Sequence, residues 1–182
     1  MNAKIMGTGY ELPAFRADND YLATLVDTSD EWIRERTGIC ARHLAKEETT
    51  TSMAAKAARK ALQKAGVDAS EVELVIVATI TGDTDTPSTA CKVQAQIGAD
   101  HAVAFDMNAA CSGFVYAMDT AHRFLKTDSS MRYALVVANE SLSKITNYSD
   151  RSSCILFGDG AAAAVIEYKE DALYTSHLGA DG

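Results

Sequence analysis

Hydrophobic positions along the chain alternate between strand-like runs and helix-like stripes. The near-continuous apolar runs at 74–80 and 133–138, rich in Val, Ile and Ala, predict strands covered on both faces. The strongest helical stripe lies at 51–65. Further helices are predicted over 18–26, 30–36, 88–97 and 112–126, and shorter strands over 4–7 and 101–106. This alternation predicts an α/β layered fold with a mainly parallel sheet and helices on both faces.

Small and polar residues mark where these elements start and stop. Thr28 and Ser29 are candidate N-caps for the helix at 30–36. Glycine follows three of the predicted helices, at Gly38, Gly66 and Gly98. Near the C-terminal end, the apolar segments 153–157 and 161–167 flank Gly158-Asp-Gly160. That pattern predicts a β-hairpin, which would add antiparallel pairing to the sheet.

Length and charge narrow the class of protein. A chain of 182 residues is large enough to bury a core as one domain. Its formal net charge of −8 disfavours nucleic acid or an anionic membrane as a partner, because both require a cationic surface. The N-terminus has no apolar leader, and a membrane span requires roughly 20 apolar residues, far more than the longest runs here. We therefore expect a soluble, cytoplasmic protein.

The four cysteines do not form a metal-binding pattern. They are Cys40, Cys91, Cys111 and Cys154, and none belongs to a C-x-x-C pair. Cys40 and His43 have the spacing of one zinc-ligand pair, but no second pair accompanies them, so no metal site is expected. In a cytoplasmic protein we expect all four to be reduced thiols.

Cys111 lies where the predicted strand at 101–106 gives way to the helix at 112–126. A thiol at a helix N-terminus has its thiolate stabilised by the helix dipole, and the free N–H groups there can donate to a developing oxyanion. This arrangement suits covalent acyl transfer through a thioester. The local residues leave open the alternative of an inert packing cysteine. The helix is apolar around much of its circumference, so we expect it to be covered on more than one side.

Five motifs, in order along the whole chain, resemble β-ketoacyl-[acyl carrier protein] synthase III of the thiolase superfamily. They are Asp27-Thr-Ser-Asp-Glu-Trp-Ile33, Arg36-Thr-Gly-Ile39, Ala109-Ala-Cys-Ser-Gly-Phe114, Asp150-Arg151 and Phe157-Gly-Asp-Gly-Ala161. The resemblance implies a thiolase-like fold built from two similar halves. Residues 1–182 would be the N-terminal half, with the C-terminal half outside this chain and packed against the helix after Cys111.

The resemblance also implies an activity and a set of site residues. Cys111 would accept an acyl group from acyl-CoA, and decarboxylative Claisen condensation with malonyl-[acyl carrier protein] would then initiate fatty acid biosynthesis. The protein would thus be an acyltransferase of lipid metabolism, with acyl-CoA as a substrate and no cofactor. Thr28, Trp32, Arg36 and Arg151 match residues that bind CoA, with Trp32 and Arg151 on the two faces of the adenine. Family members are homodimers.

Two departures from the family pattern matter. The family's catalytic histidine and asparagine belong to the second half, and none of the histidines here matches their motif: His43, His101, His122 and His177. We therefore expect that this half alone cannot condense. In addition, Thr86 stands where short-chain members carry a phenylalanine that reaches the partner's acyl pocket, which favours primers longer than acetyl.

Alternative functions remain open on the sequence alone. One is a polyketide-type starter condensing enzyme, and another is a non-catalytic subunit that binds acyl-CoA. A hydroxymethylglutaryl-CoA synthase is disfavoured by the set Thr28, Trp32 and Arg151. Without the resemblance, Trp32 would be interpreted as an anchor of an amphipathic helix and Arg151 as a solvated loop charge.

Overall fold

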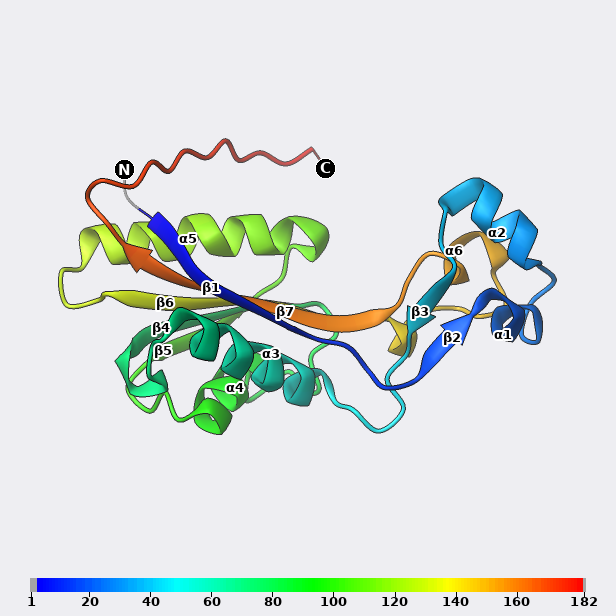
Figure 1. Ribbon diagram of the computed structural model, residues 1–182, viewed down its shortest axis with the longest axis horizontal. Coiled ribbons are helices and arrows are strands. Elements are labelled where there is room, and N and C mark those ends of the chain that lie inside the picture. Colours follow the sequence, from blue (N-terminus) through cyan, green and yellow to red (C-terminus); the bar gives the residue numbers. More distant parts are fainter. Residues whose placement is uncertain (1–2, 182) are drawn as a thin grey trace.

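The computed structural model describes residues 3–181 and has a five-stranded mixed sheet at its centre (Figure 1). The strands are β1 (Ala3–Glu11), β4 (Val72–Ala78), β5 (Val103–Met107), β6 (Tyr133–Ser141) and β7 (Asp159–Tyr168). Their order across the sheet is β1-β7-β6-β4-β5. β4 pairs in parallel with both β5 and β6, whereas β7 runs antiparallel between β1 and β6. Parallel pairing is thus confined to the three strands β5, β4 and β6.

Helices cover both faces of this sheet, as the sequence predicted. α3 (Thr50–Ala65) and α4 (Thr89–Ile97) lie on one face, and α5 (Gly113–Thr127) lies on the other (Figure 1). A separate apolar cluster fills each interface, because the side chains of the buried strands β4 and β6 point alternately to the two faces.

α3 packs close to the sheet because the residues in contact are small. Its buried face is mostly alanine, and β1 presents Gly7 to it. A Cβ atom at Gly7 would lie 2.5 Å from the Ala65 nitrogen, so the helix could not approach a larger residue there. The helix begins with a capping box between Thr49 and Ser52 and ends at Gly66, whose φ is +67°.

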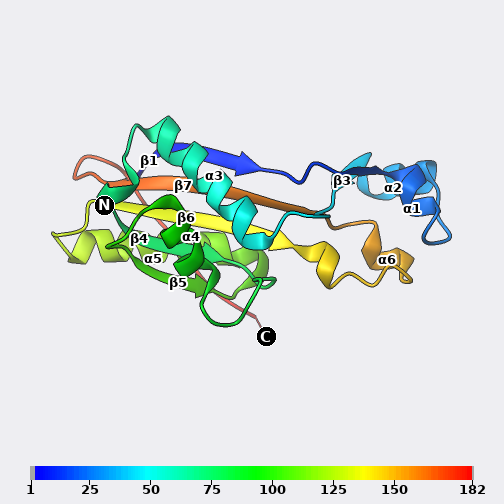
Figure 2. The ribbon, with the colours of Figure 1, turned by 90° about the horizontal axis from the view of Figure 1, so that it is seen from below.

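A small lobe extends from one end of the sheet (Figures 1 and 2). It comprises β2 (Arg16–Asp18), β3 (Ala41–His43), α1 (Asn19–Ala23), α2 (Asp30–Thr37) and α6 (Arg151–Cys154). Its core contains Leu22, Ile33, Cys154 and Ile155. Short 3₁₀ turns occur at Ala69–Glu71, Ala110–Ser112 and Leu142–Lys144.

The predicted hairpin around Gly158-Asp-Gly160 is wrong. The segment before it forms α6 and a turn, because the Asp150 carboxylate caps that helix by accepting from the Ser152 N–H at 2.9 Å. The antiparallel partners of β7 are the distant strands β1 and β6. After β7, residues 169–181 run as an extended segment beside α5 (Figure 1). No helix within residues 3–181 is long and apolar enough to cross a membrane.

Candidate active site

Cys111 lies in the 3₁₀ turn Ala110–Ser112, between the end of β5 and the start of α5. The thiol is free and the residue is exposed. Ala110, directly before it, has a φ of +45°, a left-handed conformation that costs free energy for any residue with a Cβ. No side chain caps the N-terminus of α5 in the described part of the chain. In the same part, the Cys111 N–H makes no hydrogen bond outside its own helical turn.

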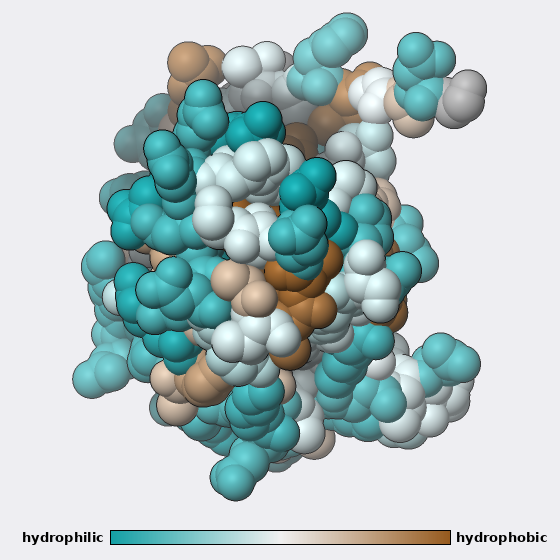
Figure 3. Space-filling model, turned by 90° about the vertical axis from the view of Figure 1, so that its right-hand side faces the viewer, coloured by the Kyte–Doolittle hydropathy of each residue, from teal (hydrophilic) through white to brown (hydrophobic). Residues whose placement is uncertain are grey.

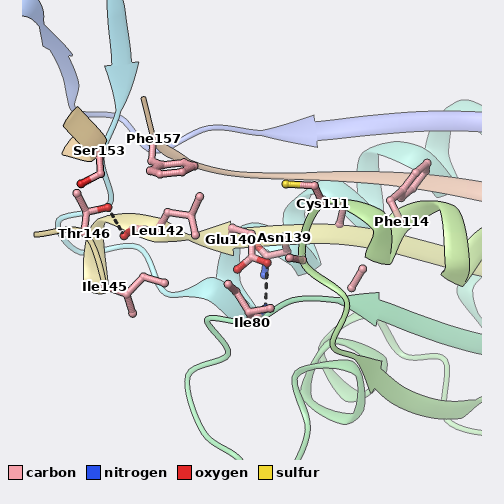
Figure 4. Close-up of a pocket in the computed structure, with 13 residues that line it drawn as sticks. Ile80, Cys111, Phe114, Asn139, Glu140, Leu142, Ile145, Thr146, Ser153 and Phe157 are labelled. Carbon is pink, nitrogen blue, oxygen red and sulfur yellow. Dashed lines mark hydrogen bonds between the residues drawn. The ribbon is translucent and has the colours of Figure 1, made fainter. Parts of the chain in front are cut away.

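A cavity of about 400 Å³ opens beside Cys111. In Figure 4 the Cys111 side chain points into this space, toward the side where Phe157 lies. The lining is mostly aliphatic or aromatic and includes Ile80, Phe114, Leu142, Ile145 and Phe157. Such a lining suits an apolar chain attached to the cysteine sulfur.

The polar side chains that line the cavity form hydrogen bonds to neighbouring parts of the chain. The Glu140 carboxylate accepts from the Ile80 N–H at 2.9 Å (Figure 4), from the Thr79 hydroxyl at 3.3 Å and from the Thr81 hydroxyl. Asn139 donates from Nδ2 to the Thr50 carbonyl at 2.6 Å. Glu140 therefore fixes the strand end that carries Ile80.

No histidine lines the cavity as the structure describes it. His43 Nδ1 lies 2.6 Å from the Pro13 carbonyl, and His122 is buried in α5 with its ring 4.4 Å from that of Tyr174. The described lining of the cavity thus includes no imidazole that could act on the Cys111 thiol.

Trp32, Arg36 and Arg151 come together in the small lobe. The guanidinium carbon of Arg36 lies 4.3 Å from the centre of the Trp32 ring, and that of Arg151 lies 4.5 Å from it. We call these three residues the arginine–tryptophan stack. Arg151 also donates from Nη1 to the Asp27 carbonyl at 3.2 Å. Flat cationic groups beside an indole form a surface suited to an aromatic base and to phosphate.

Thr28 precedes α2 but does not cap it. The cap is Ser29, whose hydroxyl accepts from the Trp32 N–H at 3.1 Å. The Thr28 hydroxyl oxygen is buried and has no hydrogen-bond partner among residues 3–181. A ligand could reach this oxygen only after the Thr28 side chain or the residues that cover it had moved.

The cavity and the stack share helix α6. Ser153 lines the cavity at the end away from Cys111 (Figure 4), and Arg151 begins the same helix two residues earlier. A ligand that spans both features would place a flat aromatic group near Trp32 and a reactive group at Cys111.

The other predicted positions lie apart from this arrangement. Cys154 is buried, and burial raises the pKa of its thiol, with the Asp150 charge adding to the effect. Cys40 is exposed, with Sγ 2.9 Å from the Arg34 guanidinium. Thr86 is exposed and does not line the cavity of its own chain. No group of three or more His, Cys, Asp or Glu side chains that could hold a metal ion occurs within residues 3–181.

Asp159 is a buried residue that the sequence analysis missed. Its carboxylate accepts from the Ala45 N–H at 2.7 Å, from the Ser143 N–H at 2.8 Å and from the Ser143 hydroxyl at 2.5 Å. It thereby joins the small lobe to the turn that carries the cavity residue Leu142. The aspartate within Gly158-Asp-Gly160 was the available signal, but the motif was assigned to a hairpin turn.

A family model and curated proteins that match this chain carry the same description. A family model described as 3-oxoacyl-[acyl-carrier-protein (ACP)] synthase III matches residues 105–182. The chain is 48% identical to the β-ketoacyl-[acyl-carrier-protein] synthase III of Clostridium botulinum (strain Loch Maree / Type A3), covering all of this chain and 56% of that protein. A protein of the same name from Clostridium beijerinckii is also 48% identical over 182 residues. The chain thus spans about half the length of the curated relatives it matches.

Solved structures show the same fold. The crystal structure of 3-oxoacyl-[acyl-carrier-protein] synthase III from Aquifex aeolicus VF5 matches with a TM-score of 0.90 and 50% identity, over 93% of this chain and 55% of that chain. The priming β-ketosynthase of the R1128 polyketide biosynthetic pathway matches with a TM-score of 0.89 and 38% identity, over 92% of this chain and 50% of that chain. These similarities confirm the thiolase-like fold class and the resemblance carried by the five motifs.

Proposed function

Because this chain is related over its whole length to the β-ketoacyl-[acyl-carrier-protein] synthases III, we propose that it is the N-terminal half of such an acyltransferase. Cys111 is the residue that accepts the acyl group. The observation that carries the proposal is the exposed Cys111 thiol at the uncapped start of α5, pointing into an apolar cavity that extends to α6.

Acylation follows from this geometry. The Cys111 thiolate attacks the thioester carbonyl of acyl-CoA, the bond from that carbon to the CoA sulfur breaks, and CoA leaves as the thiol after taking up a proton. The Cys111 N–H, which makes no hydrogen bond outside its own helical turn, donates to the oxyanion that forms on the carbonyl oxygen. The acyl chain then occupies the cavity beside Ile80, Phe114 and Phe157. Acyl transfer of this kind requires no cofactor, because one thioester is exchanged for another and the CoA thiolate is the leaving group.

The arginine–tryptophan stack binds the nucleotide end of acyl-CoA. The Arg151 guanidinium lies 4.5 Å from the Trp32 ring centre, too close for a base to fit between them, so the adenine stacks on Trp32 once one guanidinium group has swung off the ring. Arg36 and Arg151 provide positive charge for the phosphates, and Thr28 directly precedes the cap of the helix that carries Trp32. The pantetheine arm runs from α6 along the cavity to Cys111.

Condensation requires the other half of the enzyme. Malonyl-[acyl carrier protein] loses CO2, the electron pair of the broken C–C bond attacks the Cys111 thioester carbonyl, and the sulfur is released as the extended product forms. The developing enolate oxygen needs hydrogen-bond donors, which we assign to the histidine and asparagine expected in the C-terminal half. This chain alone therefore accepts an acyl group but does not extend it.

The setting of the complete enzyme is cytoplasmic, where acyl-CoA and acyl carrier protein are available. We expect it to be a homodimer. β5 supports this expectation, because it is an edge strand with Val103 46% exposed and could pair with a second copy. Sedimentation of the complete enzyme as a monomer would contradict this part of the proposal.

A second candidate function is priming of a polyketide pathway. It rests on the similarity to the R1128 priming β-ketosynthase, whose identity of 38% is lower than the 50% of the Aquifex aeolicus enzyme. The exposed Thr86, in place of a phenylalanine, agrees with a primer longer than acetyl in either pathway. Turnover of the complete enzyme with acetyl-CoA and with longer acyl-CoAs separates short-chain from long-chain priming.

The test of the proposal is the intact mass of the protein after incubation with acetyl-CoA and with longer acyl-CoAs. We expect an acyl adduct on the native chain and on Cys91→Ala, and none on Cys111→Ala. An adduct that persists in Cys111→Ala would refute the assigned nucleophile. CoA binding without any adduct would instead support a non-catalytic acyl-CoA-binding subunit.

A further inference from the structure

Arg42 is a buried arginine with no acidic partner. It belongs to β3 in the small lobe and is 7% exposed. Among residues 3–181 no Asp or Glu forms an ion pair with it, and its Nε atom has no hydrogen-bond partner. Burying a guanidinium costs free energy unless its hydrogen bonds compensate. The hydrogen bonds that Arg42 does form therefore indicate its role.

The Arg42 contacts join segments that are distant in the sequence. Nη1 donates to the Asn19 side-chain oxygen at 2.9 Å, and Nη2 donates to the Ile155 carbonyl, directly after α6, also at 2.9 Å. Asn19 is itself fully buried. Its Nδ2 donates to the Asp30 carboxylate at 2.8 Å and to the Ile39 carbonyl at 2.7 Å. We call Arg42 and Asn19 with these bonds the Arg42–Asn19 bridge.

The bridge ties together the two helices that form the arginine–tryptophan stack. Asp30 is the first residue of α2, which carries Trp32, and Ile39 follows the end of that helix. On the other side, Ile155 is the C-cap of α6, which begins with Arg151. α6 has only four residues, so it cannot hold its place by its own hydrogen bonds. The bond from Arg151 to the Asp27 carbonyl is exposed and is therefore a weak constraint.

We propose that Arg42 and Asn19 are positioning residues for the nucleotide end of acyl-CoA, and that they act by holding α2 and α6 at the separation at which Arg151 reaches the Trp32 ring. The nature of the ligand rests on the proposed function, whereas the effect on the stack does not. Helices that are already held at this separation lower the cost of ordering the site when the ligand binds. Loss of the bridge should therefore weaken CoA binding and leave the reactivity of Cys111 unchanged.

The first measurement needs no ligand. Trp32 is the only tryptophan of the chain, so acrylamide quenching of its fluorescence reports directly on the stack. We expect Arg42→Met to raise the quenching constant to that of Arg151→Met, because in both variants a guanidinium leaves the ring. Arg59→Met is the matched control, since it removes an arginine that donates to a backbone carbonyl, that of Gln96, outside the lobe. Quenching of Arg42→Met at the native value would overturn the proposal.

The second measurement uses CoA and calorimetry on the same variants. We expect Arg42→Met and Asn19→Ala each to raise the Kd for CoA about tenfold, which corresponds to about 1.4 kcal/mol. The double variant should lose no more than either single variant, because residues of one hydrogen-bond network are not additive. Iodoacetamide alkylation of Cys111, measured on its peptide by mass spectrometry, should keep the native rate.

The two measurements separate the bridge from the proposed function. Failure of the native protein to bind CoA would refute the nucleotide site, and the quenching result would still decide whether the bridge holds the stack. Additive losses in the double variant, or an equal fall in Cys111 alkylation, would show a general loss of folding and refute a positioning role. If Arg42→Met does not fold, Asn19→Ala carries both measurements.

Discussion

Replacing Asp159 by asparagine should destabilise the junction between the small lobe and the sheet. In the native carboxylate, Oδ1 accepts from the Ser143 N–H, and Oδ2 accepts from the Ala45 N–H and the Ser143 hydroxyl. Asparagine has one acceptor oxygen and one NH2 group. In either orientation its NH2 group therefore faces a backbone N–H that cannot turn round. One donor of these part-buried bonds loses its partner, and any bond that remains is no longer charge-assisted.

The magnitude follows from these losses. A hydrogen bond to a charged group contributes about 1.5–3 kcal/mol, and an unsatisfied buried donor costs about 1–3 kcal/mol, so we expect Asp159→Asn to lower the free energy of unfolding by about 2–4 kcal/mol. Urea unfolding followed by circular dichroism measures the loss. Asp128→Asn is the control, because that carboxylate accepts from Ser130 in its own surface turn, and its change should stay within about 0.5 kcal/mol. A loss below about 1 kcal/mol for Asp159→Asn would refute the assigned bonds.

Two further predictions concern the arginine–tryptophan stack and the buried His122 of α5. Trp32→Ala should raise the Kd for CoA about tenfold in calorimetry, because base stacking contributes about 1–3 kcal/mol, whereas Trp32→Phe should keep most of the affinity. A Trp32→Ala variant that binds CoA as tightly as the native protein would exclude adenine from this site. Burial lowers the pKa of His122, with Lys126 and Arg123 adding and Asp119 opposing. The neutral imidazole favours the folded state, so its stability is present above the unfolded pKa of about 6.5 and is lost as the pH falls through the folded pKa. Urea unfolding at pH 7.5 and pH 5.5 should show a larger loss in the native protein than in His122→Gln, and equal losses would contradict this.

Most of the sheet and its helices could be predicted because their signals are local. The buried strands β4 and β6 are continuous apolar runs, and Gly38, Gly66 and Gly98 end their helices in the left-handed conformation that favours glycine. β1 was predicted too short, ending at Gly7 instead of Glu11. Its glycines weaken the strand pattern, yet α3 requires them for close packing.

Of the small lobe, the helices α1 and α2 were predicted from their local pattern, but the rest could not be, because non-local contacts form it. Ser153–Phe157 is a short apolar run that favours a strand, but Cys154 and Ile155 are buried against Leu22 and Ile33, more than 100 positions earlier in the chain. β2 and β3 have three residues each, too few to show a period. The same limit applies to Arg42 and Asn19, whose polar side chains carry no pattern that indicates burial.

The candidate site also contains residues with a local sequence signal and residues without one. The junction between β5 and α5 predicted the place of Cys111, although the residue lies in a 3₁₀ turn and not in the first turn of the helix. Trp32 and Arg151 were paired only through the family resemblance, because no local signal connects them. The expected cover of α5 proved to come partly from residues 169–181, through the bond of 2.5 Å from the Tyr116 hydroxyl to the Gly179 carbonyl. Val115 remains 52% exposed.

The pairing of β1 with β7 has a consequence for synthesis of the chain on the ribosome. β1 emerges first and has β7 as its only strand neighbour in the described sheet, and β7 begins only at Asp159. At 5–20 residues per second, β1 waits roughly 7–30 s for that partner. Of the elements that pack on β1, α3 is completed much earlier, at Ala65. A nascent β1 protected by its alanine-lined contact with α3 would be kept from pairing with other chains during that interval.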